Sequence, residues 1–281
     1  MTIAITGATG QLGRLAIRSF HAKGAAKDLV ALVRDPAKAA DIGIAARAFD
    51  YSKPQTLAPA LKGIQTLVLI SSNDFNDRFG QHKAVIDAAK AAGVGHVIYT
   101  SILKGDASPM LMADDHKKTE AYLKSSGLPY TLLRNGWYTE NYTASLAGSV
   151  AAGGMIGSAG SGRISSAPRK DYAEAIVAVA LTPALQGKVY ELAGDNSYTM
   201  ADMAATVSAK AGKPVPYTSL PTADYAKALE SFGLPPGFAN VLADSDAHAA
   251  KGALHDDSKT LSRLIGRPTT PMADTVAEAL A

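Results

Sequence analysis

The chain contains no cysteine among its 281 residues. This absence excludes disulfide bonds, cysteine-ligated zinc and a thiol nucleophile, so any redox chemistry has to come from a bound cofactor. The chain also has little excess charge of either sign. It contains 28 Lys and Arg residues and 25 Asp and Glu residues, which gives a formal net charge of +3. So small an excess argues against a nucleic-acid partner, which requires a clustered basic surface.

Long hydrophobic runs are missing as well. No segment approaches the roughly 20 apolar residues that a membrane-spanning helix requires. Residues 1–6 (MTIAIT) carry neither the basic segment nor the cleavage site of a signal peptide, and they run directly into a glycine loop. We therefore expect a cytoplasmic protein without a membrane span, and the sequence makes no prediction about its oligomeric state.

Short apolar runs alternate with helical patterns through the first half of the chain. The runs are almost continuous in Val, Ile and Leu, which is typical of a parallel sheet covered on both faces. Their alternation with helices predicts an α/β fold, a Rossmann-type doubly wound parallel sheet. The predicted strands are 2–6, 28–33, 44–49, 66–71, 96–101 and 130–134. The predicted helices are 12–23, 37–42, 55–61, 81–92 and 113–125.

The alternation of apolar runs with helical patterns ends after Asn135. Residues 150–162 are rich in Gly, Ala and Ser and indicate loops between short strands. We expect a nucleotide-binding domain over 1–135, with 165–195 added to its sheet. Residues 136–164 and 196–281 then form a smaller, mostly helical C-terminal lobe on the substrate side. The later elements are a helix 170–181, a strand 188–192 and helices 199–211, 222–232, 239–250, 257–265 and 272–280. The helix 199–211 opens with Thr-Met-Ala-Asp, which is an N-cap pattern.

The strongest motif is the loop Gly7-Ala8-Thr9-Gly10-Gln11-Leu12-Gly13, which follows a strand and opens a helix. Gly7 permits a tight turn, Gly10 lets the backbone approach a pyrophosphate, and Gly13 lets the helix pack closely on the sheet. Free N–H groups at the helix N-terminus then meet the pyrophosphate. The alternative is a glycine turn that binds nothing. The further strand–helix units favour a dinucleotide site instead.

Arg34 follows the second predicted strand, where an NAD-specific site holds an acidic residue on the ribose 2′-hydroxyl. A guanidinium there binds a 2′-phosphate through charge-assisted hydrogen bonds, and Lys38 adds a second positive charge. This predicts NADPH rather than NADH. Asp35 competes for the ribose, but Asp35-Pro36 also fits a helix N-cap followed by proline. The alternative is that Arg34 is a solvated surface charge.

Several strings together carry a family resemblance. They are ITGATGQLG, LVRDPAKA, LISSN followed by QHKAVIDAAKAAGV, IYTSIL, YTLLRNGWYTENY and KTLSRLIGRPTTP. The chain resembles the NmrA-like branch of the atypical short-chain dehydrogenases over nearly its whole length. Within that branch it is especially similar to bacterial NADPH-dependent quinone oxidoreductases of type 2, and less so to triphenylmethane reductases. The resemblance implies an NADPH-dependent enzyme without flavin.

The resemblance also implies cofactor contacts in four segments. Besides the glycine loop and Arg34, they are Ser71, Ser72 and Asn73, and then Asn135, Gly136, Trp137, Tyr138, Thr139 and Glu140. The ends of the fourth and sixth predicted strands flank the crevice where open α/β sheets bind ligands, which suits these segments. Asp50 is placed to touch the adenine, or it simply begins a turn with Tyr51.

The proton-handling pair of ordinary short-chain dehydrogenases is absent. Those enzymes use Tyr-x-x-x-Lys, and none of the 11 tyrosines here has lysine four residues later. A quinone does not need that pair, because hydride transfer leaves a hydroquinone anion with a phenol-like pKa of about 10. The protein then has to position the reactants, while the cofactor carries the chemistry.

Trp137, Tyr138, Tyr99 and His116 are the candidate substrate-side residues. The aromatic rings could hold a flat acceptor, or Trp137 and Tyr138 could pack between the two lobes. His116 shares a helix face with Glu120 and is a candidate proton donor, with a surface pair as the alternative reading. Ser101 is a weaker catalytic candidate. The histidines show no metal-ligand spacing, so no metal site is predicted.

Three functions follow from these residues. The first is direct, flavin-independent hydride transfer from NADPH to a small-molecule quinone. The second is a non-catalytic NADP(H)-binding redox sensor, which the missing Tyr/Lys pair fits equally well. The third keeps the chemistry but changes the acceptor to another flat molecule such as a dye. The aromatic string NGWYTENY favours the first.

Overall fold

The computed structural model describes residues 1–281 and divides into two compact units. The first comprises Met1–Gly105, Asp115–Asn135 and Arg169–Tyr190, and the second comprises Asp106–Asp114, Gly136–Pro168 and Glu191–Ala281. The sequence placed residues 106–114, 165–168 and 191–195 with the sheet, and the structure groups all three segments with the second unit.

A seven-stranded sheet in the order β3-β2-β1-β4-β5-β6-β8 organises the first unit. The chain crosses from β3 back past β1 to β4, which creates the topological switch point of a doubly wound fold. The pairs from β3 through to β6 are parallel, which confirms the predicted fold class. The strands are β1 (Ile3–Thr6), β2 (Leu29–Val33), β3 (Ala45–Ala48), β4 (Thr66–Leu69), β5 (His96–Ile102), β6 (Tyr130–Asn135) and β8 (Val189–Leu192).

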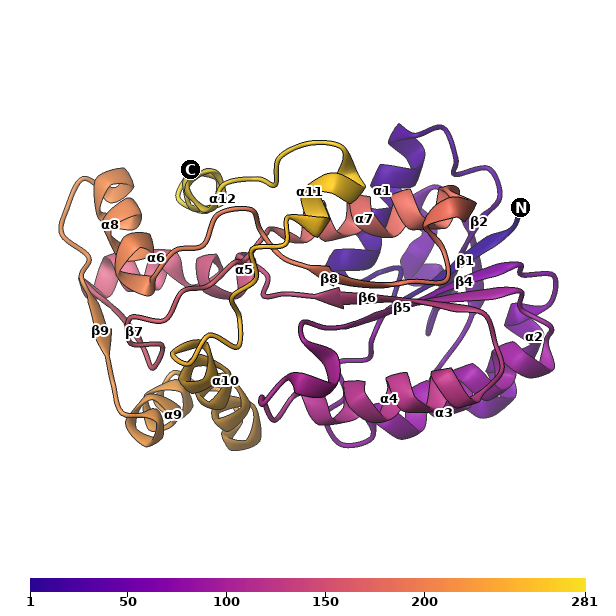
Figure 1. Ribbon diagram of the computed structural model, residues 1–281, viewed down its shortest axis with the longest axis horizontal. Coiled ribbons are helices and arrows are strands. Elements are labelled where there is room, and N and C mark those ends of the chain that lie inside the picture. The colour runs from indigo at the N-terminus through magenta and orange to yellow at the C-terminus, as the bar shows by residue number, and fades with distance from the viewer. The chain divides into compact units, whose positions relative to one another are not determined.

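Helices cover both faces of this sheet, as Figure 1 shows for α1 and α7 on one face and α2, α3 and α4 on the other. Every residue of β1, β2, β4 and β5 is buried, which explains their continuous apolar sequences. The helices are α1 (Gln11–Ala22), α2 (Leu57–Leu61), α3 (Arg78–Ala91), α4 (Ala113–Ser125) and α7 (Arg169–Leu181).

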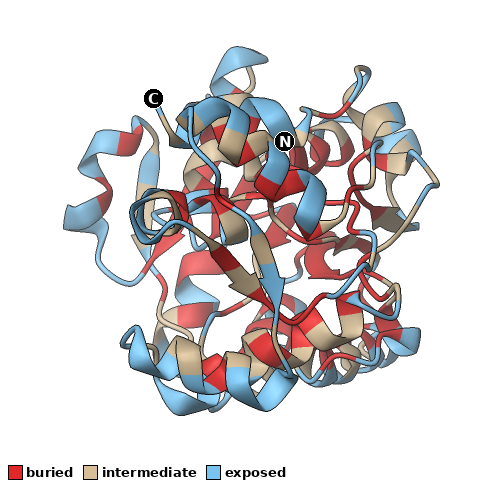
Figure 2. Cartoon of the chain, turned by 90° about the vertical axis from the view of Figure 1, so that its left-hand side faces the viewer, coloured by how far each residue is buried: buried red, intermediate tan, exposed pale blue.

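The core on the α3 side is one cluster of buried side chains. Leu67 and Leu69 of β4 and Tyr99 of β5 meet Val85 and Ile86 of α3 there. Burying a leucine or isoleucine side chain contributes about 1.5–3 kcal/mol, so this cluster holds the helix layer firmly against the sheet. Exposed residues lie along the outward sides of the helices and on loops (Figure 2). The ends of β1, β2 and β4 are therefore rigidly placed.

The second unit is mostly helical, with a small sheet in which β7 (Met155–Gly157) pairs in parallel with β9 (Tyr217–Ser219). Thr199 caps α8 through the capping box predicted from its sequence, accepting from the Asp202 amide at 3.1 Å. The helices are α5 (Glu140–Thr143), α6 (Leu146–Ala152), α8 (Met200–Ala211), α9 (Thr222–Ser231), α10 (Pro236–Ala249), α11 (Thr260–Ile265) and α12 (Met272–Ala279).

The predicted short helix 37–42 is present as a 3₁₀ helix over Pro36–Ile42. One local prediction was wrong. Residues 150–162 are not only loops between strands, since α6 extends to Ala152 before β7 begins. Alanine favours the helix there, and the prediction gave too much importance to the glycines of this segment.

A buried carboxyl lies inside the second unit. Asp246 of α10 is 4% exposed and accepts the amide of Ser158 at 2.9 Å, with the Tyr142 hydroxyl at 3.5 Å. Burial raises the pKa of Asp246 to about 6. Since the folded-state pKa lies above the unfolded value of about 3.9, this group favours the fold at low pH. Its contribution is lost as the pH rises through about 6.

Asp246→Asn is therefore expected to raise the free energy of unfolding on the order of 2 kcal/mol near pH 8. The asparagine carbonyl still accepts from Ser158, but no charge is buried. Urea unfolding across the range from about pH 4 to about pH 8 measures this, and the difference should vanish at the acid end. Asp257→Asn, an exposed carboxyl, is the matched control. A pH-independent difference for Asp246→Asn would contradict the assignment.

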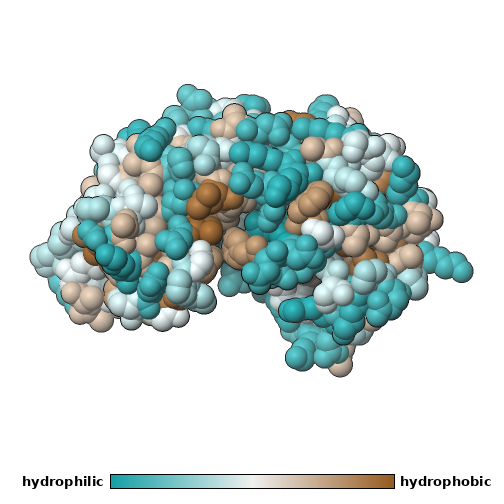
Figure 3. All heavy atoms as spheres, turned by 90° about the horizontal axis from the view of Figure 1, so that it is seen from below, coloured by the Kyte–Doolittle hydropathy of each residue, from teal (hydrophilic) through white to brown (hydrophobic).

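The surface in Figure 3 is mostly hydrophilic or neutral, and hydrophobic residues appear there only in small groups. The largest exposed apolar side chains, such as Phe232, Leu111 and Met1, are scattered along the sequence. None of the helices has the length and apolar character needed to cross a membrane.

Candidate functional site

A cavity of about 500 Å³ opens in the first unit at the carboxyl ends of the central strands. This is the switch-point position where open α/β sheets bind ligands. Every predicted cofactor contact before residue 74 lines the cavity except Ala8, whose side chain is fully buried behind the loop. The lining residues are Gly7, Thr9, Gly10, Gln11, Leu12, Gly13, Leu32, Val33, Arg34, Phe49, Asp50, Tyr51, Ser52, Ile70, Ser71, Ser72, Asn73, Asp74 and Gln81.

The glycine loop forms one wall of the cavity. Gly7 has a left-handed φ of +59°, and its carbonyl accepts the amide of Gly10 at 2.9 Å. A Cβ built on Gly13 would lie 2.3 Å from the Gly7 carbonyl oxygen, so only glycine lets α1 approach the loop this closely. No side chain caps α1, and its first turn contains no acidic residue. Its first amides therefore point toward the cavity as donors for an anion.

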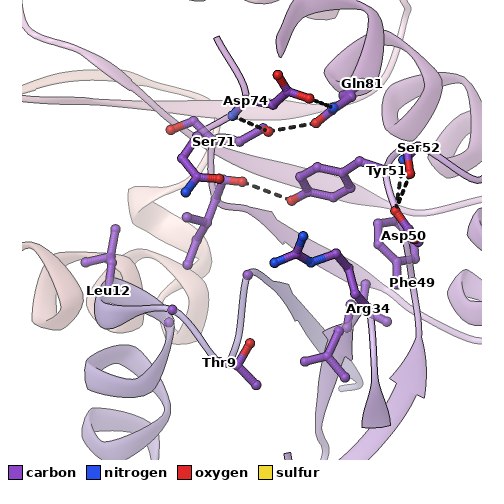
Figure 4. A pocket seen from close by; sticks show the side chains of 18 of the residues that line it. Thr9, Leu12, Arg34, Phe49, Asp50, Tyr51, Ser52, Ser71, Asp74 and Gln81 are labelled. Carbon is purple, nitrogen blue, oxygen red and sulfur yellow. Dashed lines mark hydrogen bonds between the residues drawn. The ribbon is translucent and has the colours of Figure 1, made fainter. Parts of the chain in front are cut away.

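Arg34 extends into the cavity from the end of β2 (Figure 4). Its guanidinium makes no hydrogen bond or ion pair within the protein, so its donors are available to a ligand. The neighbouring Asp35 accepts the amide of Ala37 at 3.0 Å and caps the 3₁₀ helix that begins at Pro36. Asp35 thus has the capping role predicted from its sequence, while Lys38 is exposed outside the cavity lining.

Asp50 and Tyr51 line the cavity beyond the end of β3. The Asp50 carboxylate accepts the Ser52 hydroxyl at 2.8 Å and the Ser52 amide at 3.1 Å, so it does begin a turn. These two hydrogen bonds lower the pKa of Asp50, and the one from the Ser52 hydroxyl has the larger effect. Tyr51 donates its hydroxyl to the Ile70 carbonyl at 3.0 Å and ties the β3 end to the β4 end. The sequence did not single out Tyr51.

The loop after β4 forms the opposite end of the cavity. The Ser71 amide donates to Thr100 Oγ1 at 2.9 Å, and the Ser72 hydroxyl donates to Gln81 Oε1 at 2.7 Å. Gln81 in turn donates to Asp74 at 2.6 Å, as Figure 4 shows. These hydrogen bonds restrict the conformation of the loop, so its residues present a fixed surface to a ligand.

Behind this loop lies a buried network of two histidines and a tyrosine. His82 Nε2 accepts the Ser72 amide at 2.8 Å, so the ring proton is on Nδ1, which lies 3.0 Å from Thr119 Oγ1. Tyr99 bonds to His116 Nδ1 at 2.7 Å. Burial, followed by the charge of Arg78, lowers the pKa of His82 to about 3 and that of His116 well below its usual value. Both imidazoles are neutral at neutral pH.

His116 and Glu120 are not the surface pair that the sequence allowed. His116 is 6% exposed and Glu120 is fully buried, because α4 turns this face onto the sheet. Glu120 accepts the Ser101 hydroxyl at 2.6 Å and ion-pairs with Arg134. Burial opposes its ionisation, but the bonds from Arg134 and Ser101 prevail and lower the pKa of Glu120. Ser101 is therefore held inside the fold, and Tyr99 is buried rather than open to a substrate.

The remaining predicted contacts fall where the chain passes from the first unit to the second. Asn135 is the last residue of β6, and Gly136, Trp137, Tyr138, Thr139 and Glu140 belong to the second unit. Within that unit the Trp137 carbonyl accepts the amide of Ala167 at 3.2 Å, and Thr139 donates its amide back to Ala167 at 3.0 Å. The Trp137 side chain is 7% exposed.

The comparison with protein families agrees with this geometry. Residues 7–183 match the model of an NAD(P)H-binding family. The chain belongs to this NAD(P)H-binding family. The match runs from the first residue of the glycine loop to beyond α7, so it includes every residue that lines the cavity and the strands from β2 to β6.

Relatives within the NAD(P)H-binding family match along their whole lengths. Quinone oxidoreductase 2 of Escherichia coli strain K12 is 52% identical over 98% of this chain and 97% of its own. The crystal structure of the E. coli enzyme complexed with NADPH superposes with a TM-score of 0.97 over the whole of both chains. Triphenylmethane reductase of a Citrobacter species, complexed with NADP(H), is 33% identical, with a TM-score of 0.94 over 99% of this chain and all of that one. These similarities confirm the family resemblance.

Proposed function

We propose that this protein reduces quinones by transferring a hydride directly from NADPH. The observation that carries this proposal is the full-length similarity to quinone oxidoreductase 2, at 52% identity. The cavity fits the cofactor, because the glycine loop and the uncapped first turn of α1 line it and Arg34 has free donors. The similarity to triphenylmethane reductase makes a cationic dye the second candidate acceptor.

Each part of the cavity has a role in this function. The first amides of α1 hold the pyrophosphate, and Arg34 holds the 2′-phosphate. Asp50 lies at the adenine end, and the loop from Ser71 to Asn73 orients the nicotinamide end. NADPH supplies the hydride when it is bound. The protein contributes position and a fixed polar surface, since no base is needed to accept a proton.

The proton that completes the hydroquinone comes from water. A neutral, buried His116 is a poor donor, because its charged form is strongly disfavoured. His116 therefore keeps a positioning role through its bond to Tyr99 rather than a role as proton donor. Trp137 and Tyr138 keep the role expected from the sequence, that of aromatic surfaces for a flat acceptor. Asn135 through Glu140 remain proposed cofactor contacts.

The first test is NADPH oxidation by purified, flavin-free protein, followed by the loss of NADPH absorbance with and without p-benzoquinone. Rapid, quinone-dependent oxidation with NADPH and little with NADH is the expected result. Tight NADPH binding without turnover on any quinone would contradict the proposal and favour the sensor function. Faster turnover of a triphenylmethane dye than of any quinone would identify the second candidate acceptor.

Trp137→Phe is expected to lower kcat/KM for the quinone by up to about tenfold, because the ring surface shrinks. The NADPH Kd should stay the same, because the substitution leaves the main chain of Trp137 available for its proposed cofactor contact. Phenylalanine is the suitable substitution, since alanine would open a cavity at a side chain that is 7% exposed. Steady-state kinetics and NADPH fluorescence titration measure the two quantities. Equal kcat/KM for both proteins would remove Trp137 from the substrate side.

The cytoplasmic location expected from the sequence is part of the proposal. Fractionation of cells that produce the protein tests it, with recovery in the membrane or extracellular fraction as the contrary result.

A further inference from the structure

Arg78 is a buried arginine without an acidic partner. It is the first residue of α3 and is only 4% exposed. Its Nε donates to the Ser72 carbonyl at 2.7 Å, and the ring of Phe75 covers its guanidinium with Cζ 4.4 Å from the ring centroid. No carboxylate comes within ion-pair distance. Burial lowers the pKa of Arg78, but a guanidinium keeps its charge in proteins. A buried charge without a counter-ion in contact is unfavourable for stability, so it calls for a functional explanation.

No group in contact with Arg78 carries a negative charge. His82, His116 and Tyr99 are all neutral in this environment. Asp115 and Asp74 act on Arg78 only from beyond ion-pair distance. Asp74 accepts Gln81 at 2.6 Å and the Asn76 amide at 3.0 Å, and Asp115 lies 3.8 Å from Lys118. The guanidinium of Arg78 is therefore a positive charge without a counter-ion in contact.

This charge lies one hydrogen bond behind the wall of the cofactor cavity. Ser72, whose carbonyl Arg78 holds, lines the cavity together with Ser71, Asn73 and Asp74. These residues follow β4, across the switch point from β2 and its Arg34. In a doubly wound fold this is the half that faces the reacting end of a dinucleotide. Charges in such buried surroundings act over several ångströms without contact.

We propose that Arg78 determines which acceptors the protein reduces, favouring those that become negatively charged when they accept hydride. This proposal rests on the proposed function and deepens it. A quinone gains two electrons and one hydrogen nucleus as hydride, NADPH is oxidised to NADP⁺, and an oxygen of the acceptor becomes anionic. A proton from water then completes the hydroquinone. The positive charge of Arg78 stabilises the anionic oxygen as it develops.

A cationic dye reverses this relation. A triphenylmethane cation accepts hydride at its central carbon and becomes neutral, so its positive charge disappears in the transition state. A fixed positive charge nearby repels the bound dye and does not stabilise the neutral product. The same residue therefore favours quinones over cationic dyes, and charge rather than shape decides between them.

The test compares Arg78→Gln and Arg78→Lys with the wild-type protein, using p-benzoquinone and a triphenylmethane dye as acceptors. Arg78→Gln is expected to lose about tenfold or more in kcat/KM for the quinone and to keep or gain rate with the dye. Arg78→Lys keeps the charge and should keep the wild-type ratio of the two rates. Lys90→Gln removes one exposed charge from the same helix and serves as the matched control.

A second measurement needs no turnover. 4-Nitrophenol resembles half of the reduced product, and its anion absorbs visible light. Titrated in the presence of protein and NADP⁺, it should have a lower pKa with wild type and Arg78→Lys than with Arg78→Gln. The NADPH Kd of each variant, from fluorescence, reports whether the Ser72 loop is still in place.

The outcomes separate the two proposals. A fall in quinone and dye reduction by the same factor in Arg78→Gln indicates a purely structural role and overturns the inference. Equal nitrophenol pKa values in wild type and Arg78→Gln also overturn it. If the wild-type protein oxidises NADPH with neither acceptor, the proposed function is wrong, and the nitrophenol titration still decides whether Arg78 stabilises an anionic oxygen.

Discussion

An Arg34→Ala variant is expected to lose about a hundredfold in kcat/KM with NADPH and to keep its rate with NADH. The guanidinium extends into the cavity with no partner in the protein, so its donors are free for the 2′-phosphate. Two charge-assisted hydrogen bonds to phosphate are lost in the variant, each stronger than a neutral one. NADH lacks that phosphate, so it loses nothing. Parallel steady-state kinetics with the two cofactors measure the change.

Lys38→Ala is the matched control for Arg34. It removes the same charge only four residues later, but Lys38 is exposed outside the cavity. Its NADPH preference should stay close to that of the wild type. An equal loss in both variants would show that the general positive field, rather than a direct contact, selects NADPH. Unchanged NADPH kinetics in Arg34→Ala would place the 2′-phosphate elsewhere.

A Gly13→Ala variant is expected to lose measurable NADPH binding and about 2–3 kcal/mol of stability. The added Cβ would lie 2.3 Å from the Gly7 carbonyl oxygen and 2.8 Å from the Cα of Ala8. Both contacts are with backbone, which cannot rotate away as a side chain can. Either α1 or the loop moves, and the amides that hold the pyrophosphate move with it. Fluorescence titration and urea unfolding measure the two losses.

Gly237→Ala makes the same chemical change where there is room for it. Gly237 lies in α10, and a Cβ there meets nothing within 4 Å. NADPH affinity should be unchanged, and stability should rise by up to about 1 kcal/mol, because alanine favours a helix more than glycine does. Wild-type NADPH affinity in Gly13→Ala would show that the close packing of α1 on the loop is not required for binding.

Local patterns predicted the elements of this fold well, for clear physical reasons. The strands β1, β2, β4 and β5 coincide with apolar runs, because a parallel sheet covered on both faces admits little else. The glycine loop was recognisable because each of its glycines meets a backbone constraint, such as the positive φ of Gly7. Asp35 and Thr199 were assigned as caps because their hydrogen bonds reach only two or three residues along the chain.

Contacts between distant segments could not be predicted from these local patterns. Tyr51 stands beside Asp50 in the sequence, but its bond to Ile70 exists only because the sheet, with β2 and β1 between β3 and β4, brings the ends of β3 and β4 to one cavity. His116 and Glu120 were correctly placed on one helix face. Whether that face was exposed or buried depended on how α4 packs, and the sheet buries it.

The sequence by itself determined the order of strands and helices, the dinucleotide loop, the arginine after β2 and the family. All of these depend on residues a few positions apart, where backbone geometry limits the choices. Only the tertiary structure decided the charge states behind the cavity. Arg78, His82 and His116 come from two helices, and their neutral or unpaired states arise from burial against each other and against Ser72. Burial is a property of the packed chain, because it depends on every neighbour in space.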